Sequence, residues 1–349
     1  RRAGALAAPR AMALTHLTWG RLARVNGVLL VLLLVSLLAA AAVGPVALDW
    51  RRILDAGTGV NPDAVILFRA RIPRVLLAAI VGGALAAAGA ALQALLRNPL
   101  AEPHLVGISS GAALAAVLAL VTVPVVLGHA LVVPVAAFLG ALLSIWIVVR
   151  LAFVGERVDP YTLLLIGVIY NAFTGAVLMF INSIVDLYQA HGVLFWLMGH
   201  IGTREYSTVG ALALYSLAGL SLLLWHARDL DCLSLGDERA AELGVDVERA
   251  RRMIFVAAAL LVGAVVSVSG LIGFVGLVVP HLMRLVVGAD HRMLLPASYL
   301  AGAIFLVWAD TVARTVLGAT EIPVGVVTAL VGAPVFAYLL RRERRLVEA

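Results

Sequence analysis

The sequence predicts an all-α polytopic membrane protein, and three observations lead to that fold class. First, 63% of the 349 residues are hydrophobic and only 13% are charged. Second, the mean hydropathy of +1.05 is too high for a soluble domain, which must keep a polar surface. Third, apolar runs close to the roughly 20 residues that a membrane-crossing helix needs recur along the whole chain. Short segments of alternating hydrophobicity, typical of a membrane β-barrel, do not occur in the sequence.

Clusters of glycine, proline and charge divide the chain into ten candidate spans. In order they are 25–46, 75–95, 107–127, 131–153, 161–182, 208–226, 253–271, 276–288, 296–316 and 323–340. The eighth is too short to cross alone, so we expect it to pack inside the bundle. Residues 1–24 are expected to form an N-terminal cytoplasmic tail and residues 25–345 a single transmembrane domain. An even number of spans places both termini on one side.

The arginines indicate which side that is. All 26 basic residues are arginine, and 19 of them fall in the segments that are cytoplasmic when the N-terminus is inside. This bias follows the positive-inside rule, so we expect both termini in the cytoplasm. The pI of 10.1 then reflects charges that flank the membrane and contact lipid headgroups, rather than a nucleic-acid partner.

The missing residue types exclude several chemistries. A chain without lysine has no Walker A loop and no Schiff-base site. Its single cysteine, Cys232, allows no internal disulfide and no cysteine metal cluster. The sequence therefore predicts neither a nucleotide site nor a metal site in this chain.

The stretch 236–252 is an island of charge between two apolar segments, with nine of its seventeen residues charged. We expect Ser234 and Asp237 to form a capping box at the start of a short helix, and Gly244 to end that helix in the left-handed conformation. A second helix should begin near Asp246. Ala240, Ala241 and Leu243 would give the short helix a small apolar face.

Two interpretations of this island remain open. A solvated loop whose charges set the topology is one. The other is a helix whose small apolar face, with its charged rim, fits the groove of a cytoplasmic partner.

The remaining arginines gather at the opposite side, most of them before the second span. The segment RARIPR, residues 69–74, places three positive charges at the mouth of a helix, against the topological bias. Either lipid headgroups and nearby acids such as Asp63 balance them, or they meet an acidic docking partner or an anionic ligand.

Several long motifs in the right order resemble the FecCD-type permease family, the membrane subunits of ABC importers for iron–siderophores, haem and cobalamin. They are RIPRVLLAAIVGGALAAAGAALQALLRNPLAEPHLVGISSGA, LGDERAAELGV, GFVGLVVPHLMRLVVGADHRMLLP, ADTVAR and EIPVGVVTALVGAPVFAYLL. The similarity covers residues 25–345. It implies ten transmembrane helices in two inverted five-helix repeats, and a homodimer with the pathway on its two-fold axis.

The resemblance also implies the partners and the location. Such a permease lies in the bacterial inner membrane, is not itself an enzyme, and works with two ATPase subunits and a periplasmic substrate-binding protein. ATP and magnesium are then held by the ATPase, and this chain carries no cofactor. Segment 236–244 resembles the coupling helix that docks on the ATPase, through Asp237, Glu238, Arg239, Ala240, Ala241, Leu243 and Gly244.

The family also suggests roles for two further groups. Arg71, Arg74 and Arg314 match arginines that pair with glutamates of the binding protein. Asp310 lies four residues before Arg314 on a helix, so a salt bridge between them is a competing account. Asn98 and Leu100 match positions that close the pathway on the cytoplasmic side, and an ordinary helix-ending turn at the Asn-Pro pair is the alternative.

Cargo selectivity is the least specified property. Tyr188, His191, Met198 and His200 lie between the fifth and sixth spans and are residue types that ligate iron, so we interpret them as candidate cargo contacts. They favour haem over a siderophore or cobalamin. His104 and His281 follow prolines near helix ends, where a hydrogen-bonded structural imidazole is expected.

Two other function classes would require residues of a different kind. A proton-coupled secondary transporter would need a membrane acid, for which Asp310 and Glu321 are the candidates. A membrane-embedded enzyme would need a catalytic constellation, and the sequence contains none that we can identify.

Overall fold

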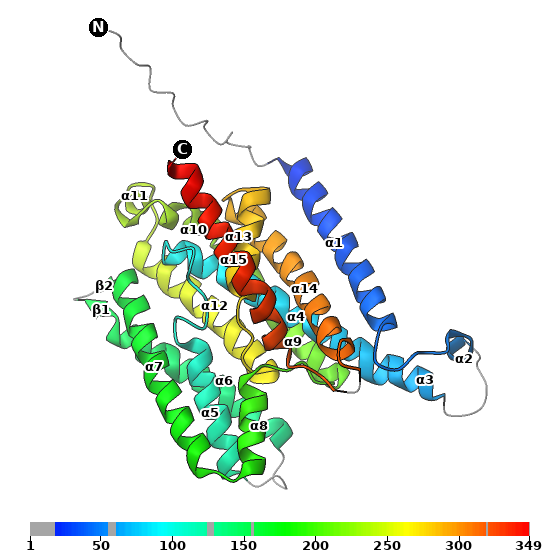
Figure 1. Ribbon diagram of the computed structural model, residues 1–349. Helices are drawn as coiled ribbons and strands as arrows, with labels where there is room; N and C mark the ends of the chain where they lie inside the picture. The colour runs from blue at the N-terminus through cyan, green and yellow to red at the C-terminus, as the bar shows by residue number, and fades with distance from the viewer. Residues whose placement is uncertain (1–17, 55–60, 124–128, 155–156, 319, 349) are drawn as a thin grey trace.

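The computed structural model describes residues 18–54, 61–123, 129–154, 157–318 and 320–348 as a bundle of helices (Figure 1). The part of the predicted cytoplasmic tail before residue 18 lies outside the described residues. The elements are α1 (Trp19–Ala42), α2 (Trp50–Leu54), α3 (Pro62–Val65), the π-helix η1 (Ile66–Arg71), α4 (Ile72–Leu95), α5 (Ile108–Thr122), α6 (His129–Leu151), β1 (Phe153–Val154), β2 (Arg157–Val158), α7 (Pro160–Ile184), α8 (Leu187–Leu197), α9 (Tyr206–Trp225), α10 (Ala227–Ser234), α11 (Asp237–Glu242), α12 (Val247–Ser269), α13 (Val275–Val287), α14 (His291–Thr315) and α15 (Val324–Glu348).

The predicted all-α membrane class is confirmed in its main features. Among the described residues, eight helices are long and apolar enough to cross a membrane, and α5 and α13 are two shorter apolar helices. These two shorter helices occupy the third and eighth predicted spans. The two-residue strands β1 and β2 form one small antiparallel hairpin. The number of membrane crossings and the inverted repeat stay predictions.

Polar side chains cap several of these helices. Thr18 accepts a hydrogen bond from the backbone N–H of Arg21, so α1 begins at Trp19 rather than at residue 25. Asp159 caps α7 by accepting from the hydroxyl and the backbone N–H of Thr162, both at 2.7 Å. These two bonds stabilise the carboxylate and lower the pKa of Asp159.

The second span starts earlier than expected. Pro62–Leu95 is one continuous apolar helix of 34 residues, so RARIPR lies inside it and not at its mouth. Pro73 has no N–H to donate and its ring crowds the preceding turn. The wide π-helix η1, which ends at Arg71, accommodates this proline without breaking the helix.

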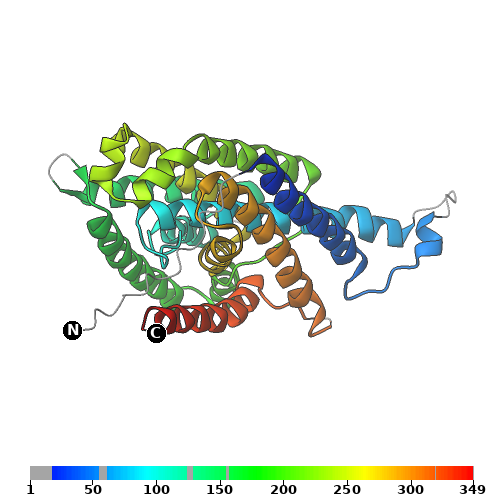
Figure 2. The ribbon, with the colours of Figure 1, turned by 90° about the horizontal axis from the view of Figure 1, so that it is seen from above.

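α4 is the centre of the bundle. Of its most apolar window 89% is buried, and α12, α13 and α14 pack around it, as Figure 2 shows for α4 in cyan. The contacts depend on glycine, since a Cβ on Gly82 would overlap the carbonyl of Gly302, and one on Gly89 would overlap the carbonyl of Gly276. Small residues let backbones approach closely in lipid, where apolarity alone does not drive association.

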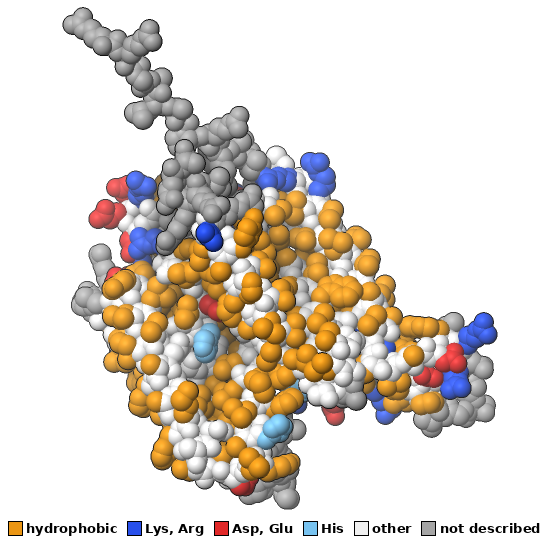
Figure 3. All heavy atoms as spheres, viewed as in Figure 1, with side chains coloured by type: hydrophobic (Ala, Val, Ile, Leu, Met, Phe, Trp, Pro, Cys, Tyr) orange, Lys and Arg blue, Asp and Glu red, His pale blue; other side chains and the backbone are white. Residues whose placement is uncertain are grey.

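The peripheral helices expose apolar side chains. In α1, α7 and α9 only 22% of the apolar window is buried, and in α15 only 28%. Hydrophobic side chains accordingly cover most of the surface in Figure 3. Such faces are stable only against lipid or against another apolar protein surface.

The two ends of the bundle carry different elements. Figure 1 places α10, α11, the start of α1 and the end of α15 at one end, which we call the α11 end. At this end α1 is linked to α13, because the guanidinium of Arg21 donates to the carbonyl of Val287 in the last turn of α13 at 3.3 Å. The elements α2, η1 and α8 lie toward the other end, which we call the η1 end.

Candidate functional site

The short helix α11 is built as a tight, self-contained turn. Gly236 precedes it with φ of +112°, and Gly244 follows it with φ of +85°, both in the range that favours glycine. After its last turn the N–H of Val245 donates to the carbonyl of Ala240 at 3.0 Å, and that of Gly244 donates to Ala241 at 2.9 Å. This pair of bonds is a Schellman motif, so the predicted left-handed stop at Gly244 is confirmed.

The predicted capping box is wrong. The N-cap position of α11 is Gly236, which has no side chain to offer, and the Ser234 hydroxyl donates instead to the carbonyl of Asp231 at 2.6 Å. Asp237 faces two arginines rather than the helix N-terminus. In an ion pair with a buried guanidinium both partners are charged, whereas a backbone N–H at a helix start offers the carboxylate only a partial charge.

The apolar face of α11 is smaller than expected. Ala240 is fully buried against the bundle, whereas Ala241 and Leu243 are exposed, and 62% of Leu243 is accessible. Glu238, Arg239 and Gly244 are exposed around them. α11 therefore presents a single large apolar side chain in a charged rim, and its inner face is anchored by Ala240.

Asp237 joins α11 to two other parts of the chain. Its carboxylate accepts from Arg251 at the start of α12 at 2.7 Å and lies 3.5 Å from the guanidinium of Arg97 after α4. Arg251 is nearly buried and also lies 3.5 Å from Glu248. A displacement of α11 would therefore pull on the first turn of α12 and on the turn that begins at Arg97.

That turn contains the two predicted gate residues. Arg97 has φ of +48°, and the Asn98 carboxamide oxygen accepts from the N–H of Leu100 at 2.9 Å. The side chain of Asn98 is thus used by the turn itself, and Leu100 is 43% exposed. The Glu102 carboxylate accepts from the N–H of Phe274 at 2.5 Å, so the segment after α4 folds back against the start of α13. The gate role of Asn98 and Leu100 stays a prediction.

At the η1 end, the three arginines predicted to dock a binding protein all point inward. Arg71 donates to the last carbonyls of α1, at 2.8 Å from that of Ala42, and also to that of Val46. Arg314 donates to the carbonyl of Ala40 and lies 3.5 Å from Asp310. The competing salt bridge between Arg314 and Asp310 is therefore present.

Arg74 completes a buried ionic cluster, which we define as Arg74, Arg314, Asp310 and Glu321. Arg74 makes a bidentate contact to Asp310 at 2.9–3.2 Å and a second to Glu321 at 2.9 Å. Asp310 is 1% exposed and Glu321 is 41% exposed. In this conformation Arg71, Arg74 and Arg314 satisfy internal acceptors, whereas Arg51, Arg52 and Arg69 are the exposed arginines near η1.

The candidate cargo contacts separate into two groups. Tyr188 and His191 lie exposed on α8. Met198 lines a cavity of about 420 Å³ together with His104, between the end of α8, residues 271–274 and the start of α15. His104, expected to be structural, thus lines the same cavity as Met198. Among the described residues no group of three metal-ligating side chains is assembled.

His200 follows α8 and belongs to neither group. Its ring is 6.2 Å from the ring of Phe195, and its backbone N–H donates to the carbonyl of Ser269 at 2.7 Å. Burial and, after it, the positive charge of Arg74 lower the pKa of His200. A neutral imidazole retains a lone pair and can accept a hydrogen bond or contact a soft iron chelate.

Sequence reasoning missed the residues that hold these sites together. Arg97, Arg251, Glu102 and the pairing of Arg74 with Asp310 were not anticipated as partners. The one available signal was the charge balance within residues 236–252, because acids and arginines alternate there at helical spacing. It did not indicate that the partners would lie on different helices.

Comparison with known proteins identifies the class. Residues 31–342 match the model of the FecCD transport family. The chain belongs to the FecCD transport family. This FecCD chain is 43% identical over 334 residues to the hemin transport system permease protein HmuU of Yersinia pestis, covering 91% of this chain and 95% of HmuU. It is 47% identical over 279 residues to the cobalamin import system permease protein BtuC of Halobacterium salinarum, covering 79% and 73%.

A solved structure agrees with this assignment. It is described as an inward-facing conformation of a metal-chelate type ABC transporter, and it matches the FecCD chain with a TM-score of 0.80 at 31% identity, covering 92% of this chain and 99% of that one. The FecCD chain is therefore a membrane-embedded permease subunit of an ABC importer.

Proposed function

We propose that this permease moves haem, or a closely related iron chelate, across the bacterial inner membrane into the cytoplasm. It would act as a homodimer of ten-helix subunits, each made of two inverted five-helix repeats, with both termini in the cytoplasm. Two ATPase subunits would bind at α11 and hold ATP and magnesium, and a periplasmic substrate-binding protein would deliver the cargo at the η1 end. The chain itself would carry no cofactor.

The observation that carries the proposal is the geometry of α11. A leucine that is 62% exposed stands in a charged rim on a helix whose other face is anchored by the buried Ala240. Leu243 supplies the apolar anchor for a groove on the ATPase, and Glu238 and Arg239 supply the polar edge. The Asp237 contacts to Arg97 and Arg251 would carry the movement of α11 to the cytoplasmic gate and to α12.

The choice of haem rests on the candidate cargo contacts and on the histidine that shares a cavity with one of them. Met198 and His104 share one cavity, and His200 lies two residues beyond Met198. Thioether and imidazole groups suit transient contact with haem iron. The similarity to HmuU over nearly the full length of both chains supports the same choice. A cobalamin importer is the second candidate, because the identity to a cobalamin permease is also high.

A stand-alone proton-coupled transporter is less well supported. Its proton carrier would have to be a membrane acid whose charge can be lost during the cycle. Asp310, the candidate for that role, is held by a bidentate contact from Arg74 and lies beside Arg314. Protonation of Asp310 would leave the buried Arg314 without its carboxylate and Arg74 with Glu321 alone, which opposes the loss of its charge.

The test is reconstitution of the full chain in liposomes with its ATPase and binding protein. Uptake of haem, a ferric siderophore and cobalamin is measured in parallel with and without ATP. ATP-dependent accumulation of haem alone is the expected result. Accumulation of cobalamin alone would assign the second candidate. Uptake that needs no ATPase and follows a pH gradient would refute the importer proposal.

A matched pair of variants tests the role of α11. Leu243→Asp places a charge at the proposed apolar anchor and should abolish ATP-dependent uptake and co-purification of the ATPase. Leu235→Asp changes another leucine, 54% exposed, that precedes α11. We expect that control to retain most of the uptake. Equal loss in both variants would show that the effect is not specific to α11.

A further inference from the structure

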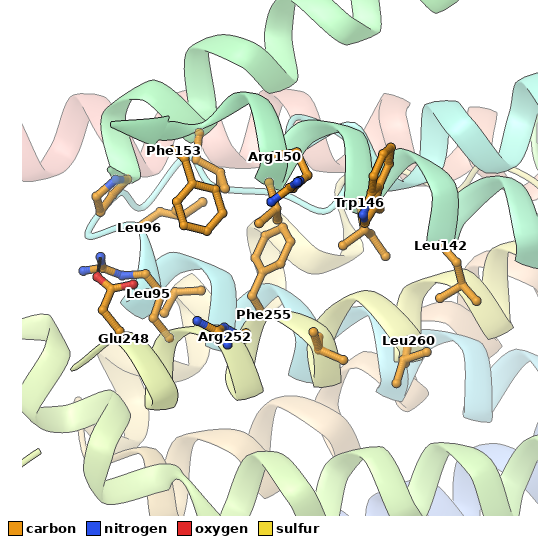
Figure 4. Close-up of a pocket in the computed structure, with 16 residues that line it drawn as sticks. Leu95, Leu96, Leu142, Trp146, Arg150, Phe153, Glu248, Arg252, Phe255 and Leu260 are labelled. Atoms are coloured by element: carbon orange, nitrogen blue, oxygen red, sulfur yellow. Dashed lines mark ion pairs between the residues drawn. The ribbon is translucent and has the colours of Figure 1, made fainter. Parts of the chain in front are cut away.

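A second cavity, of about 530 Å³, lies between α6 and α12 and shares no lining residue with the cavity of Met198 and His104. The end of α4 and the start of α7 complete its wall. Figure 4 shows Leu142 and Trp146 on the α6 side facing Phe255 and Leu260 on the α12 side. The volume falls within the roughly 300–1,000 Å³ that is typical of small-molecule sites, and most of the lining side chains are hydrophobic.

The charged groups of this cavity all lie at its α11 end. Arg251 and Glu248 lie 3.5 Å apart there, and Arg251 also binds Asp237. Arg150 and Arg252 are exposed on the two opposing helices, and in the described part of the chain they form neither a hydrogen bond nor an ion pair (Figure 4). The mouth of the cavity therefore carries two arginines that pair with no carboxylate among the described residues.

The depth of the cavity matches one membrane leaflet. On α6 it extends from Arg150 to Leu142, and on the antiparallel α12 from Glu248 to Leu260, where the apolar part lies between Arg252 and Leu260. Eight residues of helix correspond to roughly 12 Å along the axis. The hydrocarbon core of a bilayer is about 30 Å thick, so the cavity reaches from one surface to slightly short of the midplane.

The cavity has arginines at its mouth, an apolar wall and the depth of about one leaflet. These features fit a lipid better than a water-soluble ligand. We propose that this cavity binds an anionic phospholipid of the cytoplasmic leaflet, with its phosphate on Arg150 and Arg252 and an acyl chain between α6 and α12. Basic pockets between transmembrane helices on the cytoplasmic side favour anionic headgroups. The leaflet assignment rests on the orientation given under the proposed function, whereas the site itself does not.

The position of the lipid suggests what it does. The neighbouring Arg251 joins the first turn of α12 to Asp237 of α11 at 2.7 Å. A lipid that bridges Arg150 and Arg252 would hold α6 and the start of α12 together. It would thereby hold in place the start of α12, to which α11 is joined through Asp237 and Arg251.

Binding is measured on the purified full chain in phosphatidylcholine nanodiscs by native mass spectrometry. The probe is dioleoylphosphatidylglycerol, with added dioleoylphosphatidylcholine as the zwitterionic comparison. Each arginine at an anionic lipid surface contributes about a fivefold factor in affinity. We therefore expect Arg150→Gln with Arg252→Gln to weaken phosphatidylglycerol binding about twenty-fivefold. Arg228→Gln, at an exposed arginine of α10 outside the cavity, should bind within twofold of the unchanged chain.

A second pair of variants tests the apolar part without altering charge. Val256 lines the cavity and is 40% exposed, and Val31 on α1 is 60% exposed and far from it in the chain. Val256→Phe should reduce phosphatidylglycerol binding, and Val31→Phe should leave it unchanged. If the double arginine variant does not fold, Arg150→Gln alone should still lose about fivefold.

Two results would overturn the proposal. One is equal binding of the anionic and the zwitterionic lipid by the unchanged chain. The other is equal phosphatidylglycerol binding by the double arginine variant and Arg228→Gln. Neither measurement needs the ATPase, the binding protein or a cargo, so a wrong transport assignment would not produce either result.

Discussion

Asp310→Asn should destabilise this permease far more than Glu321→Gln, although both remove one carboxylate from the same ionic cluster. Asp310 is 1% exposed and is contacted by Arg74, itself 12% exposed, and by Arg314, which is 3% exposed. Removing one partner of a buried pair costs about 3–5 kcal/mol, because it leaves an uncompensated buried charge. Here one carboxylate serves two guanidiniums, and we expect a loss of about 3 kcal/mol or more.

Glu321 is the control because it contacts the same guanidinium from the surface. Glu321 is 41% exposed, so water screens its interaction with Arg74. When the carboxylate is removed, water can hydrate the guanidinium in its place. Pairs of this kind contribute about 0–1 kcal/mol. The expected difference between the two variants is therefore at least about 2 kcal/mol.

The assay is detergent-induced unfolding in mixed micelles, followed by far-ultraviolet circular dichroism, with the free energy taken from the midpoint. The double variant Arg74→Gln with Asp310→Asn completes a thermodynamic cycle and isolates the pair from its surroundings. A coupling energy near zero, or equal destabilisation by Asp310→Asn and Glu321→Gln, would refute the buried-cluster reasoning.

Three further predictions concern other parts of the chain. Gly89→Ala should cost about 2–3 kcal/mol in the same unfolding assay, because a carbonyl occupies the space of the new methyl, whereas Gly175→Ala, with no atom within 4 Å, should be neutral or stabilising. Asp237→Asn and Arg97→Gln should each reduce cargo-stimulated ATP hydrolysis in the reconstituted complex while leaving basal hydrolysis intact, and unchanged stimulation would contradict the proposed link. His200 has a lowered pKa, so the folded state binds fewer protons than the unfolded state and loses stability as the pH falls below about 6.5. His200→Gln should reduce that loss in unfolding measurements at pH 7.5 and 5.5, and an identical slope would contradict it.

Hydropathy predicted the elements of the fold because lipid imposes a length and a composition on each helix separately. The stop at Gly244 and the start of a helix near Asp246 were predicted for a similar reason, since both depend on residues within one turn. The continuous helix through Pro73 was missed because the π-turn that accommodates it leaves no mark in hydropathy.

The candidate site was predicted as a set of residues but not as a set of contacts. Arg74 and Asp310 lie 236 residues apart in sequence, and a single sequence holds no signal that pairs them. Asp237 was assigned to a local cap because local partners are the ones a sequence displays. The buried Arg251, fourteen residues later, donates to the same carboxylate, which therefore forms an ion pair instead of a cap.

The glycine contacts of α4 limit how the importer can move. Where one helix rests its backbone directly on another, no side chain remains between them to change rotamer and allow sliding. The contacts of Gly82 with Gly302 and of Gly89 with Gly276 thus fasten α14 and α13 to α4. An alternating-access cycle must carry these three helices together, and the larger motions should fall to α7 and α15, whose apolar windows are only 22% and 28% buried.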